Sequence, residues 1–351
     1  MDSRKIQTVG GGTYTVSLPK AWAEDHGLEA GSTVDLHTHR DGVLVVEARD
    51  PDDAIERVRI SVDDVEPEPL EQRFRAAYAA GASAVRFETD TGFTDPQRRR
   101  IETVARAMTG VTVAEETAEA ITVRTLLDPA EVSIGQSVRQ LSFVSLSMHR
   151  DAVAGLSTDR GTDLGDRDEQ ADRLAAMVDR HVGRAVARLD EVDALGQSRP
   201  ELLDLSRTAR ELERVADHAE RIADAATAVQ APVPETVDAL EAIAQTAQGV
   251  VEDAVRVVVD GAEVETASAA LRARDRVRER AEAVESHHFA AGDTEYHLVR
   301  VLDSLRRTAE HGGNVAEIGL RTAVRNGTLA QPLVGQVADD GHVDTAADTS
   351  G

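Results

Sequence analysis

Residues 211–224 read ELERVADHAERIAD, and residues 304–317 read SLRRTAEHGGNVAE. Aligned without gaps, the two stretches keep identical residues at the pairs Leu212/Leu305, Arg214/Arg307, Ala216/Ala309, His218/His311 and Ala223/Ala316. In the first stretch apolar residues recur at a spacing of three to four, which is the period of an amphipathic helix. The chain therefore contains an internal repeat whose two copies lie on helices.

Helical periodicity continues on both sides of the repeat, and prolines and glycines separate the segments. The expected helices cover residues 132–156, 167–195, 201–229, 234–259, 265–289 and 294–326. Three helices followed by three helices predict two tandem three-helix bundles, over residues 131–233 and 234–327. The remaining residues, 328–351, read as a disordered acidic tail.

The first 50 residues have a different, β-rich pattern. One predicted hairpin joins residues 5–9 and 14–18 through a glycine turn at residues 10–12, and a second turns at Arg40, Asp41 and Gly42. A short helix over residues 20–26 separates the two hairpins, after Pro19. Two hairpins make too small a core to be stable alone, so we expect a homodimer through this segment.

Residues 51–130 alternate the two element types and predict a small α/β module. Its expected strands and helices cover residues 58–62, 70–80, 84–88, 96–108, 111–113 and 120–124. The fold class is therefore multi-domain and mainly α. The N-terminal β segment comes first, the α/β module second and the tandem bundles last.

Composition excludes several classes of protein. The 351 residues include 39 basic and 64 acidic side chains, a net charge of −25, and no cysteine, so disulfides, thiolate metal sites and cysteine nucleophiles are ruled out. Neither a membrane span nor an apolar leader is visible, which favours a cytoplasmic protein without membrane insertion. No phosphate-binding loop or nucleophile motif is present, so we expect no enzymatic activity. The acid-rich, lysine-poor composition resembles proteins of halophilic archaea.

Carboxylates form ladders on two of the predicted helices. Glu213, Asp217, Glu220 and Asp224 share one arc at spacings of four, three and four, and Asp168, Asp172 and Asp179 share an arc on the preceding helix. Converging carboxylates repel unless a cation binds, and oxygen ligands favour Mg, Ca, Mn or Fe. The alternative is a solvated helix face, neutralised by Arg214 and Arg221.

The run Leu212-Glu213-Arg214-Val215-Ala216-Asp217-His218, followed by Ile222-Ala223-Asp224, resembles the signature of PhoU proteins, the phosphate-uptake regulators. Members are built of two three-helix bundles and bind metal clusters through carboxylates. The resemblance implies as ligands Asp168, Asp172, Glu213 and Asp217 in the first half, and Asp275, Glu279 and Glu310 in the second. The chain departs from the pattern at Arg306, where the motif has an acid, which puts the second-half site in doubt.

The N-terminal segment is similar to the swapped-hairpin family of AbrB, SpoVT and MazE. The matching residues are Arg4 to Gln7, the glycine turn, Val16 to Trp22, Gly27 to Ser32, and Asp41 with Gly42. Members interleave hairpins of two chains into one barrel, and many bind DNA. The resemblance implies DNA contacts at Arg4, Lys5 and Lys20. The turn lacks the arginine typical of DNA-binding members, and residues 1–50 carry 5 basic and 8 acidic side chains, a net of −3.

Together these features predict a non-enzymatic regulator of phosphate uptake and homeostasis. The hairpin segment would dimerise and bind operator DNA, and the PhoU-like helices would sense state through a carboxylate-bound metal or a partner. One alternative is an adaptor that binds no DNA and acts on a phosphate transporter ATPase or a kinase. Another is a carboxylate metal store or enzyme. The operator, the metal, the ligand and the direction of regulation are not encoded in any visible motif.

Overall fold

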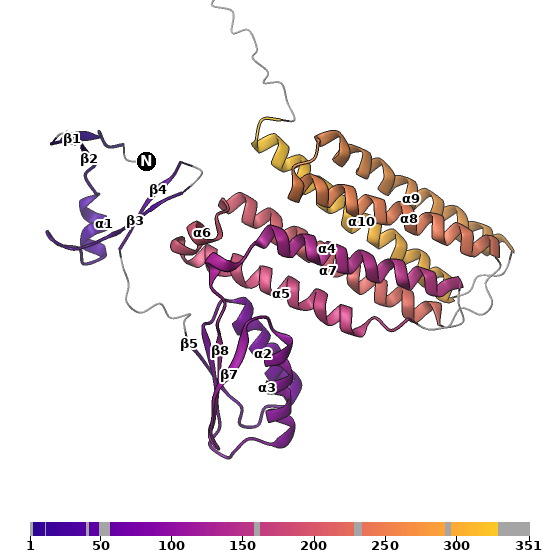
Figure 1. Cartoon of the computed structure of the whole chain (residues 1–351), viewed down its shortest axis with the longest axis horizontal. Coiled ribbons are helices and arrows are strands. Elements are labelled where there is room, and N and C mark those ends of the chain that lie inside the picture. The colour runs from indigo at the N-terminus through magenta and orange to yellow at the C-terminus, as the bar shows by residue number, and fades with distance from the viewer. Residues whose placement is uncertain are drawn as a thin grey trace, which may run out of the picture. The chain divides into compact units, whose positions relative to one another are not determined.

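The structure is a computed structural model that describes residues 3–10, 12–39, 42–48, 57–157, 162–227, 234–291 and 296–328 (Figure 1). The predicted fold class is confirmed: small β hairpins come first, an α/β module follows, and long helices make up the rest. Gly11 of the first predicted turn, Arg40 and Asp41 of the second, and the predicted acidic tail from residue 329 onward lie outside the described residues.

The N-terminal segment consists of two separate two-stranded antiparallel sheets with a short helix between them. Strands β1 (Gln7–Val9) and β2 (Thr13–Thr15) form the first sheet, helix α1 (Lys20–Asp25) follows, and β3 (Asp35–Thr38) pairs with β4 (Leu44–Glu47). All five elements were expected from the sequence, although the strands are shorter. Large apolar side chains of both hairpins stay exposed within the single chain: Ile6, Val9, Tyr14, Leu36 and Leu44. A barrel that covers them requires a second copy and stays a prediction.

The α/β module has a four-stranded sheet in the order β5-β6-β8-β7, in which only β5 and β6 run parallel. Its elements are β5 (Arg57–Ser61), α2 (Pro67–Ala79), β6 (Ala84–Glu88), α3 (Asp95–Ala107), β7 (Val111–Glu116) and β8 (Ala120–Thr125). Alternation along β6 turns Val85 and Phe87 into the core, where Phe87 meets the ring of Phe74 edge-on at 5.2 Å. The module therefore has a hydrophobic core of its own.

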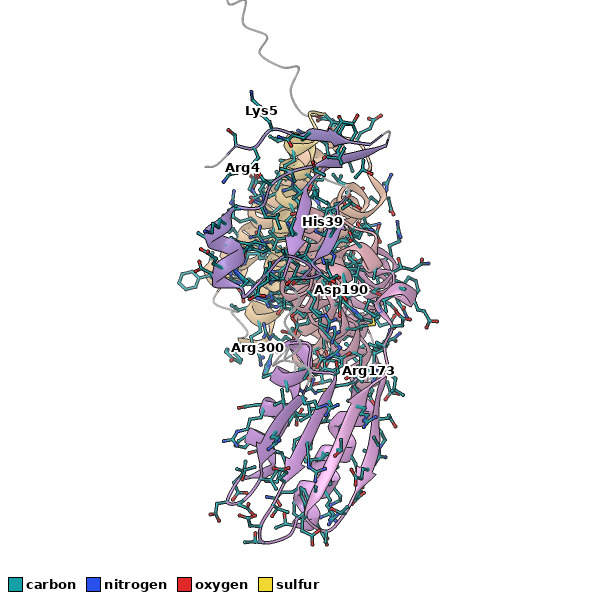
Figure 2. The ribbon with its side chains drawn as sticks, turned by 90° about the vertical axis from the view of Figure 1, so that its left-hand side faces the viewer. Arg4, Lys5, His39, Arg173, Asp190 and Arg300 are labelled. Atoms are coloured by element: carbon teal, nitrogen blue, oxygen red, sulfur yellow. The ribbon has the colours of Figure 1, made fainter. Side chains whose placement is uncertain are left out.

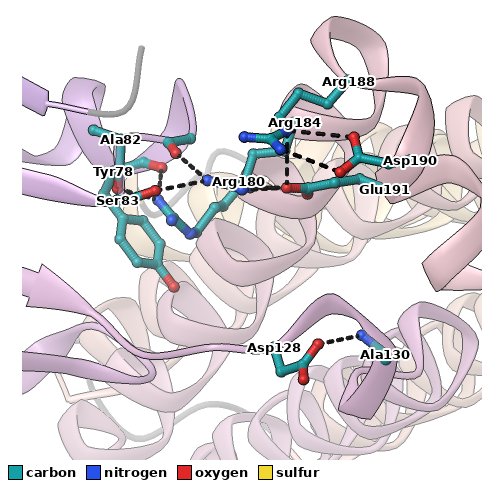
Figure 3. Close-up of polar contacts among 11 residues, drawn as sticks. Tyr78, Ala82, Ser83, Asp128, Ala130, Arg180, Arg184, Arg188, Asp190 and Glu191 are labelled. Atoms are coloured by element: carbon teal, nitrogen blue, oxygen red, sulfur yellow. Dashed lines mark hydrogen bonds and ion pairs between the residues drawn. The ribbon is translucent and has the colours of Figure 1, made fainter. Parts of the chain in front are cut away.

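Helix α5 (Gly165–Ala187) holds the carbonyl end of α2 through two arginines (Figure 3). The Nη1 of Arg180 donates to the carbonyl oxygens of Tyr78 and Ala82, both at 2.9 Å, and its guanidinium lies over the Tyr78 ring. The Nη1 of Arg184 donates to the carbonyl oxygen of Gly81 at 2.7 Å. The carbonyl end of a helix carries partial negative charge, so these cations satisfy it while they are themselves shielded from water.

The helix expected over residues 167–195 is wrong in one respect, because the chain breaks it at Arg188. That residue has the extended angles φ −130° and ψ 118°, and a separate helix α6 (Leu189–Leu195) follows. Glu191 is buried and accepts from the Nε of Arg184 at 2.6 Å. On an unbroken helix the two residues would be about 10.5 Å apart along the axis. The break brings the buried carboxylate to its partner.

The remaining helices follow the predicted pattern closely. They are α4 (Ile134–Ala154), α7 (Arg199–Ala226), α8 (Pro234–Asp260), α9 (Val264–Ala291) and α10 (Tyr296–Arg325). Helices α8, α9 and α10 each pack against the other two. By contact the chain divides into two compact units, residues 1–137 with 173–206 and residues 138–172 with 207–351.

Gly312 lies at a close approach of α10 to α8. A Cβ atom at this position would lie 2.9 Å from both the Cγ1 of Val250 and the backbone nitrogen of Val251. We expect Gly312→Ala to lower the free energy of unfolding by about 1–3 kcal/mol, because backbone must shift to admit the methyl group.

The matched control for that variant is Gly249→Ala on α8, where a Cβ meets no atom within 4 Å. This change should stabilise the protein by about 0.5–1 kcal/mol through helix propensity alone. Thermal melting followed by circular dichroism measures both. A Gly312→Ala protein as stable as the Gly249→Ala protein would show that the close approach is wrong.

Candidate functional site

An acidic cluster forms where the first turns of α5 face α7. Asp168 and Asp172 lie on α5, and Asp217 and Glu220 lie on α7. All four belong to the same compact unit. The two carboxylate ladders expected from the sequence thus come within electrostatic reach of each other. Glu213 lies one helical turn before Asp217 and is half-buried.

Asp168 has the most perturbed carboxyl group of the cluster. Partial burial raises its pKa to about 6, and repulsion from Glu220, Asp172, Asp217 and Glu169 adds to the shift. Burial and the neighbouring Asp224, Asp217 and Asp172 also raise the pKa of Glu220. A carboxyl whose pKa is raised by other carboxylates sits in a field that favours a proton or a cation.

The corresponding acids of the second half are neutralised by arginines. Asp275 on α9 lies 3.1 Å from Arg274 and 3.6 Å from Arg278, and Glu310 on α10 lies 3.0 Å from Arg307. Arg306, which replaces an acid of the motif, is paired with Glu285 at 3.0 Å. Glu279 is exposed on α9. Two of the three second-half acids, Asp275 and Glu310, therefore lie next to arginines.

No group of three or more histidine or acidic side chains is arranged as metal ligands within the described residues. The acids of the cluster are near enough to repel, yet their oxygens do not converge on one point. Asp179, the third member of the predicted ladder on α5, accepts instead from the hydroxyl of Ser206 at 3.1 Å. A cation would have to draw the remaining carboxylates together.

The two histidines of the internal repeat meet each other. The rings of His218 on α7 and His311 on α10 stack with centroids 5.4 Å apart, and the Nδ1 of His311 lies 2.8 Å from Glu211. Burial and the nearby Arg221 together lower the pKa of His218 to about 3. Two equivalent positions of the repeat therefore lie side by side in the folded chain.

His149 on α4 is a polar core residue that no sequence motif indicated. It is fully buried, its Nδ1 lies 3.0 Å from the amide nitrogen of Gln248 on α8, and its Nε2 has no hydrogen-bond partner. Burial lowers its pKa to about 4. The only signal in the sequence is a histidine on an apolar helix face, which does not reveal its neighbours.

The three basic residues expected to contact DNA all lie on the N-terminal segment. Figure 2 shows Arg4 and Lys5 on the stretch that leads into the first hairpin, and both are exposed. Lys20 is the first residue of α1, and its ammonium lies 3.4 Å from Glu24, with 88% of its side chain exposed. An ion pair this exposed is weak, so it leaves Lys20 available for a phosphate.

A pocket of about 520 Å³ opens in the α/β module beside the loops that follow β5 and β6. Its charged lining residues are all acidic: Asp63, Asp64 and Glu66. Asp63 accepts from the hydroxyls of Thr89 and Thr91, and the Thr89 hydrogen bond is the main reason that its pKa falls to about 2. Asp63 therefore holds the two loops together.

Two segments of the chain match known protein families. Residues 138–226 match the PhoU domain, and residues 7–53 match MazE, described as antidote-toxin recognition and bacterial antitoxin. The chain resembles PhoU in its helices and MazE at its N-terminus. Both resemblances expected from the sequence are thereby confirmed. The first-half cluster lies within the PhoU match, whereas Asp275, Glu279 and Glu310 lie beyond it.

Similarity to solved structures and curated proteins is limited. A crystal structure of PhoU from Pseudomonas aeruginosa aligns with 56% of this chain and 96% of its own, at 16% identity and a TM-score of 0.44. No curated protein matches the chain in sequence. Across the described ranges, no helix is long and apolar enough to cross a membrane.

The raised pKa of Asp168 predicts that the stability of the folded protein depends on pH. The pKa of an aspartate in the unfolded chain is near 3.9, whereas that of Asp168 in the folded protein is about 6. Above about pH 6 the ionised carboxylate therefore destabilises the folded protein. This destabilisation disappears as the pH falls from about 6 to about 4, because the folded protein then binds the proton. Asp168→Asn should therefore stabilise the protein at pH 7.5, by about 1 kcal/mol after allowance for solvent screening. Thermal melting at pH 7.5 and pH 4.5 measures this.

Asp166→Asn is the control for that variant, because Asp166 is exposed in the same first turn of α5. Removing this charge should lower stability slightly, since acids in a first turn favour the helix. Destabilisation by Asp168→Asn at both pH values would contradict the repulsion inferred for the cluster.

Proposed function

We propose that the protein is a cytoplasmic, dimeric, non-enzymatic regulator of phosphate uptake. The observation that carries the proposal is the presence, on one chain, of a match to the PhoU domain and a match to MazE. In this proposal the N-terminal segment binds operator DNA, and the helices with the acidic cluster detect the phosphate state of the cell.

The acidic cluster is the proposed sensor site. Asp168, Asp172, Glu213 and Asp217 would hold a hard cation, because carboxylate oxygens suit Mg, Ca, Mn or Fe. Burial and repulsion from neighbouring carboxylates raise the pKa of Asp168, which supports this proposal, since a bound cation would relieve the repulsion. A cation with open coordination positions would supply positive charge that attracts phosphate. The protein's own acids set where that charge is held.

Uncovered apolar side chains support the proposed dimer. Leu36 is 62% exposed and Tyr14 is 76% exposed, although both lie on strands of the hairpin segment. Burying such side chains contributes about 1.5–3 kcal/mol each. A second copy of this segment would provide the partner surface, and pairing would also bring two sets of Arg4, Lys5 and Lys20 to one DNA site.

The DNA-binding half of the proposal is tested with Arg4→Ala and Lys5→Ala in the full chain. Each lost phosphate contact should weaken operator binding roughly tenfold at moderate salt and reduce the slope of log affinity against log salt by about 1. Electrophoretic shifts on promoters of phosphate-transport genes, over a series of salt concentrations, measure both quantities.

The control is Arg106→Ala on α3, which removes an exposed arginine paired with Glu102 outside the hairpin segment. It should leave binding unchanged. Sedimentation must show that every variant remains dimeric. If wild-type dimers shift no promoter fragment at any salt concentration, the protein does not act by binding these operators.

The proposed metal site is tested by elemental analysis of the protein after incubation with Mn²⁺ or Fe²⁺ and gel filtration. We expect at least about one ion per chain, lost in the double variant Asp168→Asn with Asp217→Asn. Asp275→Asn is the control, because that acid already faces two arginines. Equal metal content in all three proteins would remove the acidic cluster from the proposed function.

A second candidate is an adaptor that dimerises but binds no DNA and acts on a phosphate transporter ATPase or a kinase. The observation that favours it is the charge of residues 1–50, which carry 5 basic and 8 acidic side chains, a net of −3. Recovery of a transporter subunit with the tagged protein, together with no shift of promoter DNA, would favour the adaptor.

A further inference from the structure

The second hairpin contacts the helices through a buried histidine. His39 follows β3 directly, and 3% of its side chain is exposed. Its Nδ1 lies 3.0 Å from the Oδ1 of Asp193 on α6, and its Nε2 lies 3.0 Å from the Nη2 of Arg199, the first residue of α7. These residues belong to one compact unit, in which α6 packs against β3. His39 and the neighbouring helices are drawn in Figure 2.

The partners of His39 determine which form of the imidazole fits. An arginine side chain only donates hydrogen bonds, so the Nε2 of His39 must accept from Arg199. The proton then resides on Nδ1, where it is donated to the carboxylate of Asp193. The neutral ring therefore connects a guanidinium to a carboxylate, and every polar atom of the ring has a partner.

A second histidine extends the contact. The Nε2 of His37 lies 3.0 Å from Glu47 on β4, and its Nδ1 lies 3.9 Å from the second carboxylate oxygen of Asp193. The rings of His37 and His39 are nearly parallel, with centroids 6.3 Å apart. Asp193 thus faces one histidine with each of its oxygens.

The hairpin has two faces of different character. In the β3–β4 register His37 pairs with Val45, while Leu36 pairs with Val46 and Thr38 with Leu44. Side chains alternate along a strand, so Leu36 and Leu44 lie on the face opposite His37 and His39. Both leucines are more than half exposed. The face with His37 and His39 contacts α6, and the face with Leu36 and Leu44 is exposed.

We propose that the histidine face of the β3–β4 hairpin is a dedicated interface that fixes the hairpin to α6 and the start of α7. The hairpin and α6 then form one cooperative unit that opens together. The apolar face remains for a second copy of the chain. The interface needs neither DNA nor a metal, so it stands or falls independently of the function proposed above.

The test is hydrogen–deuterium exchange on the full chain, read at the amides of residues 35–39, 44–47 and 189–195. In His39→Ala and in Asp193→Ala both the hairpin and α6 should exchange roughly 10- to 100-fold faster, because a buried charge-assisted contact is lost. The effects of the two changes should be less than additive in the double variant, since both remove the hydrogen bond between His39 and Asp193.

Two further variants separate the interface from general damage. His39→Gln keeps a donor and an acceptor on one side chain and should retain at least part of the protection, whereas His39→Lys cannot accept from Arg199 and should lose it. His26→Ala on the same segment should change nothing at α6, because His26 bonds to the Trp22 carbonyl within its own helix end and its ring lies against Trp22. Melting curves confirm that the helices of each variant remain folded.

The proposal is overturned if exchange at residues 189–195 is the same in His39→Ala as in wild type. It is also overturned if the hairpin alone becomes faster while α6 is unaffected, because the two would then open independently. Equal exchange in the Gln and Lys variants would show that the hydrogen-bond pattern of His39 does not hold the contact.

Discussion

The proposed site of the helical half depends on the partial burial of carboxylates that lie close to one another. At the start of α5, burial and the neighbouring Glu220, Asp172, Asp217 and Glu169 together raise the pKa of Asp168 to about 6. The protein could have neutralised them with arginines, as it does at Asp275 and Glu310 in the second half. The internal repeat thus keeps its helical pattern in both halves, while among the described residues Asp275 and Glu310 of the second half face arginines.

The N-terminal segment is too small to form a hydrophobic core of its own, and this is a second constraint on the structure. Strands of three and four residues cannot bury their own apolar side chains. The second hairpin gains a neighbour on one face through His37 and His39, which contact α6. Its other face keeps Leu36 and Leu44 exposed. The segment is thus supported from within the chain and still has a surface for association.

Most elements were predictable because their residues repeat at the period of a helix or a strand over many positions. The break of the helix at Arg188 could not be predicted, because it depends on the hydrogen bond between Arg184 and the buried Glu191 in the folded structure. The acidic ladders were visible as spacings on single helices. Their convergence, and the separate pairing of Asp179 with Ser206, depend on which helix lies alongside. The contacts of His39 and His149 follow from tertiary packing, which a linear pattern does not contain.

Helix α7 runs unbroken from Arg199 to Ala226, so it carries both Arg199, which binds His39, and Asp217 and Glu220 of the acidic cluster. A continuous helix twists little about its own axis, because each turn is hydrogen-bonded to the next. Arg199 belongs to the first compact unit and Asp217 and Glu220 belong to the second, so α7 is shared by both units. The placement of the His39 contact and of the acidic cluster therefore depends on the same uninterrupted series of backbone hydrogen bonds.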